Sequence, residues 1–108
     1  MTTTAATATS ITEPVDFTSV RNHKERAVFA AVLDRAERYP GIAHDPQLLA
    51  DVACVALNRL PPRYIRHEVD FVFYLSDLER VQSERNLVDA VDHAFGFVQA
   101  RTAMRARG

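Results

Sequence analysis

The sequence predicts a mainly α-helical fold: a small helical domain with one short strand at about residues 65–75. Three observations predict it. Apolar residues recur every three or four positions in the segments 19–39, 45–60 and 76–107, which is the spacing of an amphipathic or buried helix. Only residues 65–75 alternate with the two-residue period of a strand. A chain of 108 residues with three glycines and no internal repeat is expected to form one domain.

The first predicted helix follows a tail that is rich in Thr, Ala and Ser. Residues 1–18 have no apolar periodicity, so we expect a disordered tail there and a helical domain over residues 19–108. Ser19 suits the N-cap position, and an apolar stripe that includes Val28 and Val32 favours a helix as far as Tyr39. Pro40-Gly41 is then expected to end it.

The second predicted helix has clear signals at both ends. Asp45 suits the N-cap and Pro46 the first helical position. Apolar residues cover most of the circumference up to Leu57, which indicates a central, largely buried helix that includes Cys54. Pro61 restricts the residue before it to extended geometry, so the helix should end near Leu60.

The alternating segment raises a problem of pairing. Ile65, Val69, Phe71, Phe73 and Leu75 would share one face of a strand. No second strand is evident in the sequence, and an unpaired strand leaves its backbone groups without partners. We therefore predict a homodimer in which this strand pairs antiparallel with its own copy across a two-fold axis. A wholly helical interpretation of residues 65–75 remains open.

The last predicted helix is the longest element. Ser76-Asp77-Leu78-Glu79 has the form of a capping box, with Ser83 as a second possible start. Gly96 lies inside the helix, where it would allow close approach by a neighbour. A helix-packing seam follows steps of three and four residues: Val81, Glu84, Val88, Val91, Phe95, Val98 and Thr102.

Composition and motifs argue against several classes of function. A formal net charge of −1 makes DNA an improbable partner, although Arg101, Arg105 and Arg107 leave weak nucleic-acid binding open. No window is long and apolar enough for a membrane helix or a secretory signal, and one cysteine excludes a disulfide and a cysteine-rich zinc site. A buried thiol at Cys54 favours a reducing, cytoplasmic location. Because phosphate-loop, G-x-S-x-G and H-E-x-x-H motifs are absent from the sequence, we expect no enzyme, metal or cofactor.

The most informative segment is LNRLPPRY, residues 57–64, which we term the proline corner. Two consecutive prolines favour rigid polyproline geometry, which presents neighbouring side chains with little entropy left to lose. An arginine held there can bind a phosphate or a guanine edge with two parallel hydrogen bonds, and Tyr64 can stack on a base. An architectural interpretation is equally open, in which Arg59 and Arg63 bond helix-end carbonyls or pair with acids.

The segment Asp51 to Leu75 resembles the signature region of the late competence development protein ComFB family. The similarity centres on the proline corner and extends from about Glu25 into the final helix. This resemblance implies a small, helical, dimer-forming domain without catalytic activity. Some members have cysteines that can hold zinc, but the corresponding segment here, GIAHDPQ, has none.

Relatives in this family are receptors for cyclic di-GMP, so the resemblance implies a cytoplasmic cyclic di-GMP receptor that signals through an unidentified downstream protein. A two-fold symmetric dinucleotide matches a homodimer that brings two proline corners together. The alternative is a protein-interaction module in competence, pilus or motility regulation with no nucleotide ligand. Candidate ligand-binding residues are Arg63 and Tyr64 in the matched motif and, by position, Asn58, Arg59, Arg66, His67 and Asp70.

Overall fold

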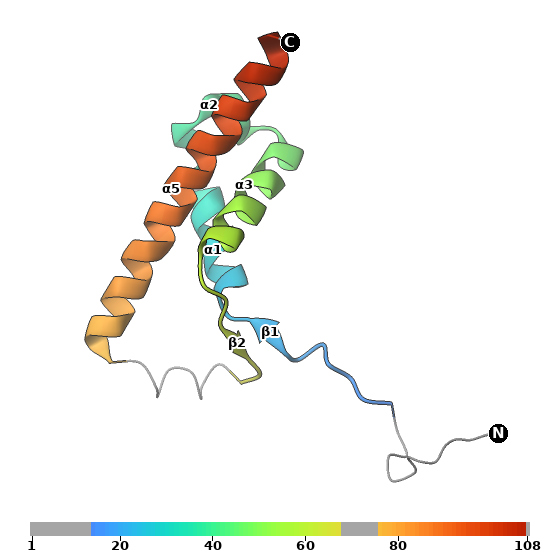
Figure 1. The fold of residues 1–108 in the computed structure, drawn as a ribbon, viewed down its shortest axis with the longest axis vertical. Helices are drawn as coiled ribbons and strands as arrows, with labels where there is room; N and C mark the ends of the chain where they lie inside the picture. The colour runs from blue at the N-terminus through green and yellow to red at the C-terminus, as the bar shows by residue number, and fades with distance from the viewer. Residues whose placement is uncertain (1–13, 68–75, 108) are drawn as a thin grey trace, which may run out of the picture.

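The structure of the chain is a computed structural model that describes residues 14–67 and 76–107. The elements follow in the order β1 (Arg21–Asn22), α1 (Lys24–Arg35), the 3-10 helix η1 (Ala36–Arg38), α2 (Pro40–Ala43), α3 (Pro46–Arg59), β2 (Tyr64–Ile65) and α5 (Asp77–Arg107). Figure 1 shows α1, α3 and the long α5 side by side, with the two short strands at one end of the helices. The mainly helical prediction is confirmed.

The hydrophobic core lies where α1, α3 and the second half of α5 meet. Its centre is Phe95, whose ring stacks on Tyr39 with centroids 4.3 Å apart and planes inclined by 2°. Offset or stacked aromatic pairs of this kind add to the free energy gained from burial alone. The other fully buried large side chains come from all three helices and α2: Val28, Ile42, Val52, Val91 and Val98.

The first helix begins later than the sequence predicts. Arg21 and Asn22 are extended in β1, and α1 starts at Lys24 rather than beside Ser19. The Asn22 side chain accepts a hydrogen bond from the backbone N–H of Lys24 (3.2 Å), which satisfies one of the free donors at the helix start. Helical structure gives way before Pro40, as predicted, but Pro40-Gly41 does not end helical structure altogether, because Pro40 opens the one-turn α2.

The predicted bounds of α3 are confirmed at both ends. The Asp45 carboxylate accepts hydrogen bonds from the backbone N–H groups of Gln47 (3.0 Å) and Leu48 (3.2 Å), and Leu60 is extended with ψ 141°. The degree of burial differs from the prediction. Only Val52, Ala53 and Ala56 of this helix are buried, and Cys54, predicted to be a buried thiol, is exposed. One face of α3 is therefore open to solvent.

The start of the predicted strand has a partner inside its own chain. Tyr64–Ile65 pairs antiparallel with Arg21–Asn22, with Arg21 opposite Ile65 and Asn22 opposite Tyr64. The premise that no partner strand exists in this chain is therefore wrong for these residues. Two residues show no periodicity, and β1 falls within a segment that the sequence assigns to a helix. The rest of the predicted strand, residues 68–75, lies outside the described residues, and pairing across a homodimer remains a prediction.

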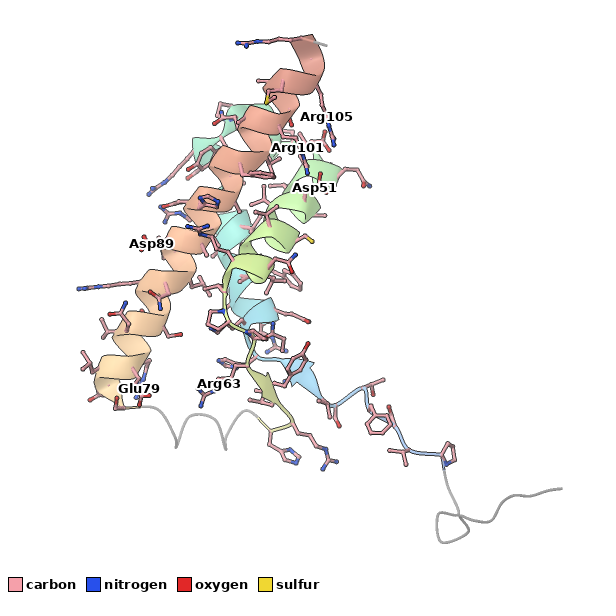
Figure 2. The ribbon with its side chains drawn as sticks, viewed as in Figure 1. Asp51, Arg63, Glu79, Asp89, Arg101 and Arg105 are labelled. Atoms are coloured by element: carbon pink, nitrogen blue, oxygen red, sulfur yellow. The ribbon has the colours of Figure 1, made fainter. Side chains whose placement is uncertain are left out.

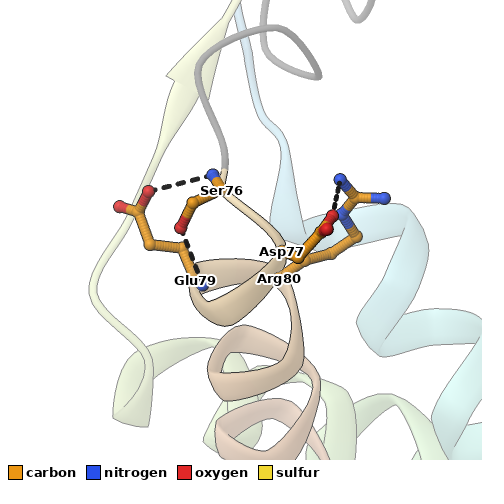
Figure 3. Close-up of polar contacts among 4 residues, drawn as sticks. All are labelled: Ser76, Asp77, Glu79 and Arg80. Atoms are coloured by element: carbon orange, nitrogen blue, oxygen red, sulfur yellow. Dashed lines mark hydrogen bonds and ion pairs between the residues drawn. The ribbon is translucent and has the colours of Figure 1, made fainter.

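The predicted capping box opens α5 (Figure 3). The backbone N–H of Glu79 donates to Ser76 Oγ (3.1 Å), and the backbone N–H of Ser76 donates to the Glu79 carboxylate (3.0 Å). The helix continues unbroken through Ser83. Among the described residues, no helix is long and apolar enough to cross a membrane.

The two halves of α5 differ in burial. Val91, Phe95 and Val98 of the predicted seam are fully buried, whereas Val81 is 49% exposed because the first turns of α5 project past α1 and α3 (Figure 1). The seam is thus correct only for the second half of the helix. The expected close approach at Gly96 is wrong for the described part of the chain, in which no atom lies within 4 Å of the position that a Cβ would occupy there.

Candidate functional site

The proline corner is held in place by the segment that precedes α1. The Asn22 side-chain oxygen accepts a hydrogen bond from the backbone N–H of Arg63 (3.1 Å), in addition to the bond from Lys24. The carbonyl of Arg63 accepts a hydrogen bond from the backbone N–H of His23 (2.6 Å). Both backbone groups of Arg63 are therefore bonded to β1 and the α1 start, which fixes the residue from which its side chain projects.

This arrangement places two cationic side chains close together. The pKa of Lys24 is lowered, first because partial burial disfavours its charged form and second because the Arg63 guanidinium repels its charge. Two positive charges close to each other, one of them partly buried, are favourable for an incoming anion. Lys24 belongs to the start of α1 and Arg63 to the proline corner, and the backbone N–H groups of both donate to the Asn22 side chain.

Arg63 also faces the beginning of α5. Figure 2 shows Arg63 at the end of the molecule where Glu79 opens that helix. The pKa of Glu79 is lowered chiefly by its hydrogen bonds with Ser76, and the charge of Arg63 lowers it further. The guanidinium thus lies within electrostatic reach of one cation and one anion, each from a different helix terminus.

The candidate residues at the end of α3 serve the architecture. The Asn58 side-chain amide donates to the carbonyl of Cys54 (3.0 Å), so this candidate ligand-binding residue bonds a backbone carbonyl of its own helix. Arg59 Nη1 lies 3.4 Å from Nε2 of His93 on α5. Arg59 therefore bridges α3 to α5.

The candidates that follow the prolines lie together on β2 and just beyond it. Tyr64 is 66% exposed and pairs through its backbone with Asn22. The Arg66 guanidinium donates from Nε to the Ser19 hydroxyl (3.1 Å), and His67 is exposed. Asp70 lies outside the described residues. The structure thus brings Arg63, Tyr64 and Arg66 to one end of the molecule.

Sequence reasoning missed the contribution of the residues before α1. Arg21, Asn22 and Lys24 lie about forty positions from the proline corner, in a segment predicted to be helical, and only the β1–β2 pairing brings them there. A shallow hollow of about 270 Å³ lies next to them, lined by Arg21, Asn22, His23, Glu25, Arg26 and Phe29. The only signal in the sequence was the mixture of basic residues and one asparagine at positions 21–26.

The cationic cluster at the C-terminus is partly neutralised. Arg101 donates to the Asp51 carboxylate of α3 (2.7 Å), and Figure 2 shows this pair between the two helices. Arg105 and Arg107 are exposed on the last turns of α5, where they complement the helix dipole. Over residues 14–67 and 76–107, no three His, Cys, Asp or Glu side chains are grouped as a metal site requires.

Comparison with known proteins gives one family. The model of the family described as "Late competence development protein ComFB" matches residues 21–102, which includes β1, the proline corner and most of α5. No curated protein and no solved structure matches the chain.

Proposed function

Since the chain belongs to the ComFB family of small, competence-related proteins, we propose that it is a non-enzymatic cyclic di-GMP receptor. It acts in the cytoplasm as a homodimer and passes its state to a protein partner. The ligand class comes from the family resemblance, and the residue-level support comes from the end of the molecule at which Arg63, Tyr64 and Lys24 meet.

The observation that carries the proposal is the proximity of two cationic side chains, Lys24 and Arg63, where the start of α1 meets the proline corner. The pKa of Lys24 is lowered first by partial burial and second by repulsion from Arg63, so the folded protein holds two like charges near each other at an electrostatic cost. A phosphate between them would offset the repulsion, because its negative charge attracts both cations. Arginine can bond two phosphate oxygens or a guanine edge at once, whereas the lysine ammonium acts as a point charge.

Tyr64 supplies the second chemical element of the proposed site. Its ring is largely exposed on β2, next in sequence to Arg63, and its backbone is fixed by the pairing with Asn22. An aromatic ring on a fixed backbone offers a stacking surface for a purine. A dinucleotide with two guanines and two phosphates presents both of the groups that this cluster can bind.

The test is a calorimetric titration of the purified chain with cyclic di-GMP, with GTP and cyclic AMP as competing nucleotides. We expect selective binding, and a rise in the unfolding temperature because the ligand binds the folded state. Arg63→Ala and Lys24→Gln should each weaken binding on the order of tenfold or more, since each removes a charge-assisted contact to phosphate.

Arg107→Ala is the matched control, because it removes an exposed arginine from the far end of α5. It should leave the affinity unchanged. If the wild-type chain gives neither heat nor a thermal shift, the receptor proposal is wrong, and the protein-interaction alternative becomes the leading function. If Arg107→Ala weakens binding as much as Arg63→Ala does, the affinity is a matter of overall charge and the site assignment is wrong.

A further inference from the structure

A hollow, almost wholly apolar groove runs along the outer face of α1 and α3. Its volume is about 490 Å³, and it lies on the solvent-exposed side of these helices. The floor is formed by buried Val32 and Ala53. The remaining lining comes from α1 (Phe29 and Leu33) and from α3 (Leu49, Ala50, Cys54, Leu57 and Asn58). A groove of this size without charged lining is unusual on the surface of a soluble monomer.

The same face carries large apolar side chains that stand out from it. Leu33 is 69% exposed and Phe29 is 47% exposed, both on the α1 edge of the groove. The α3 edge opposite contains the small exposed residue Ala50 beside Ala53. Protruding side chains next to a hollow of small residues make a surface that can interlock with a copy of itself.

The charged residues at the two ends of this face also suit packing against a copy of the chain about a two-fold axis. Arg26, Phe29, Leu33 and Glu37 follow steps of three and four residues, so they form one stripe that continues from α1 into η1. Arg26 and Glu37 are exposed, and neither forms an ion pair within the described part of the chain. The stripe is therefore cationic at one end, apolar in the centre and anionic at the other end.

We propose that this face is an interface at which a second copy of the chain packs, with the two α1 helices antiparallel about a two-fold axis. Phe29 and Leu33 of one copy would fill the groove of the other, and Arg26 of each copy would meet Glu37 of its partner. An antiparallel two-fold is the arrangement that pairs opposite charges at both ends, whereas a parallel arrangement would place like charges together. The assembly would be a four-helix layer of two α1 and two α3 helices.

This interface differs from the strand pairing that the sequence predicts, and it implies a different number and position of ligand sites in the dimer. The proline corner lies at the N-terminal end of α1, where Arg63 accepts from His23. Antiparallel α1 helices put the two corners at opposite ends of the dimer. Each corner is then a separate site, and the dimer takes one ligand at each end rather than one ligand on its axis.

The experiment measures the mass of the full chain in solution by sedimentation as a function of concentration. We expect a dimer for the wild type, and a monomer for Leu33→Asp, which places a charge in the apolar centre. Arg26→Glu and Glu37→Arg should each weaken dimerisation on the order of tenfold or more, because each creates two like-charge contacts. The double variant Arg26→Glu/Glu37→Arg should restore it.

Two controls separate this interface from loss of folding. Arg38→Glu makes the same charge change as Arg26→Glu at an exposed position next to the stripe, and it should leave the mass unchanged. Cys54 is the single cysteine of the chain and lines the groove, so a thiol reagent should modify it more slowly in concentrated wild-type protein than in Leu33→Asp. Circular dichroism of Leu33→Asp should match the wild type.

Three results would each overturn the proposal. They are a wild-type chain that is monomeric at every concentration, a dimer that persists in Leu33→Asp with the same affinity, and a double charge reversal that fails to restore what the single changes weaken. A persistent dimer in Leu33→Asp would favour pairing through residues 65–75 instead. Ligand binding by a monomeric chain would contradict the homodimer in the proposed function but leave its ligand and its binding residues intact, so the interface and the ligand site fail separately.

Discussion

Asn22 is the residue on which the geometry of the candidate site depends most directly. Its side-chain oxygen accepts hydrogen bonds from Lys24 at the start of α1 and from Arg63 in the proline corner, which is 41 positions away. One carboxamide thus fixes the backbones of both cationic residues of the proposed phosphate site. The sequence alone gave no reason to single it out, because an asparagine near a helix start usually serves only that helix.

Replacing Asn22 with alanine should therefore destabilise the fold and weaken ligand binding together. Two hydrogen bonds are lost, so the free energy of unfolding should fall by about 1–2 kcal/mol. Chemical denaturation measures this change. Asn86→Ala is the control, since Asn86 is exposed on α5 and only accepts from Gln82 within its own helix. Equal stability of the two variants would show that the Asn22 bonds contribute nothing.

The lowered pKa of Lys24 predicts a dependence of stability on pH. Because its charged form is disfavoured in the folded state, the penalty is fully present at neutral pH. This penalty is relieved as the pH rises from the lowered pKa of Lys24 in the folded state towards the usual pKa of a lysine. The free energy of unfolding should therefore increase over this alkaline range. Unfolding measurements on the wild type and Lys24→Gln should show the gain in the wild type only. A parallel pH profile in Lys24→Gln would assign the gain to another group.

At the scale of elements, the fold depends on what each helix buries. The sequence identified α3 and the start of α5 because caps and prolines are local signals, and Asp45 and Ser76 make the bonds expected of them. It did not identify the start of α1, where the tertiary pairing of Arg21–Asn22 with Tyr64–Ile65 overrides a helical pattern. Periodicity also failed to show that one face of α3 is open, because an apolar face can cover either a core or a partner.

The aromatic stack between the α1–α2 junction and α5 should be a main source of stability. Phe95→Ala removes a fully buried ring that stacks on Tyr39, and should lower the free energy of unfolding by about 3–5 kcal/mol. Phe97→Ala, two positions along the same helix, removes a ring that is 49% exposed and should cost much less. Thermal unfolding of the two variants measures the difference. A similar loss in both would mean that the core does not centre on Phe95.

At the scale of the whole molecule, the helical class and the family followed from the sequence, whereas the site followed only in part. Arg63 and Tyr64 lie at the proposed site, whereas Arg59 contacts His93 instead. Lys24 also belongs to the proposed site, although no motif in the sequence pointed to it. Local chemistry determines which residues can bind an anion. Their assembly into one site depends on contacts between distant segments, which one sequence does not reveal.

The projecting start of α5 has a consequence for how the fold opens. All of the buried residues of this helix lie between Ala90 and Val98, and Leu87 is partly buried against the core, so the first two turns depend mainly on bonds within the helix and on the capping box. Backbone amides there should exchange with solvent through local fraying, whereas those around Phe95 should exchange only when the core opens. One continuous helix thus spans the least and the most protected parts of the molecule. A partner that covered Leu78 and Val81 would act first by slowing exchange in these turns.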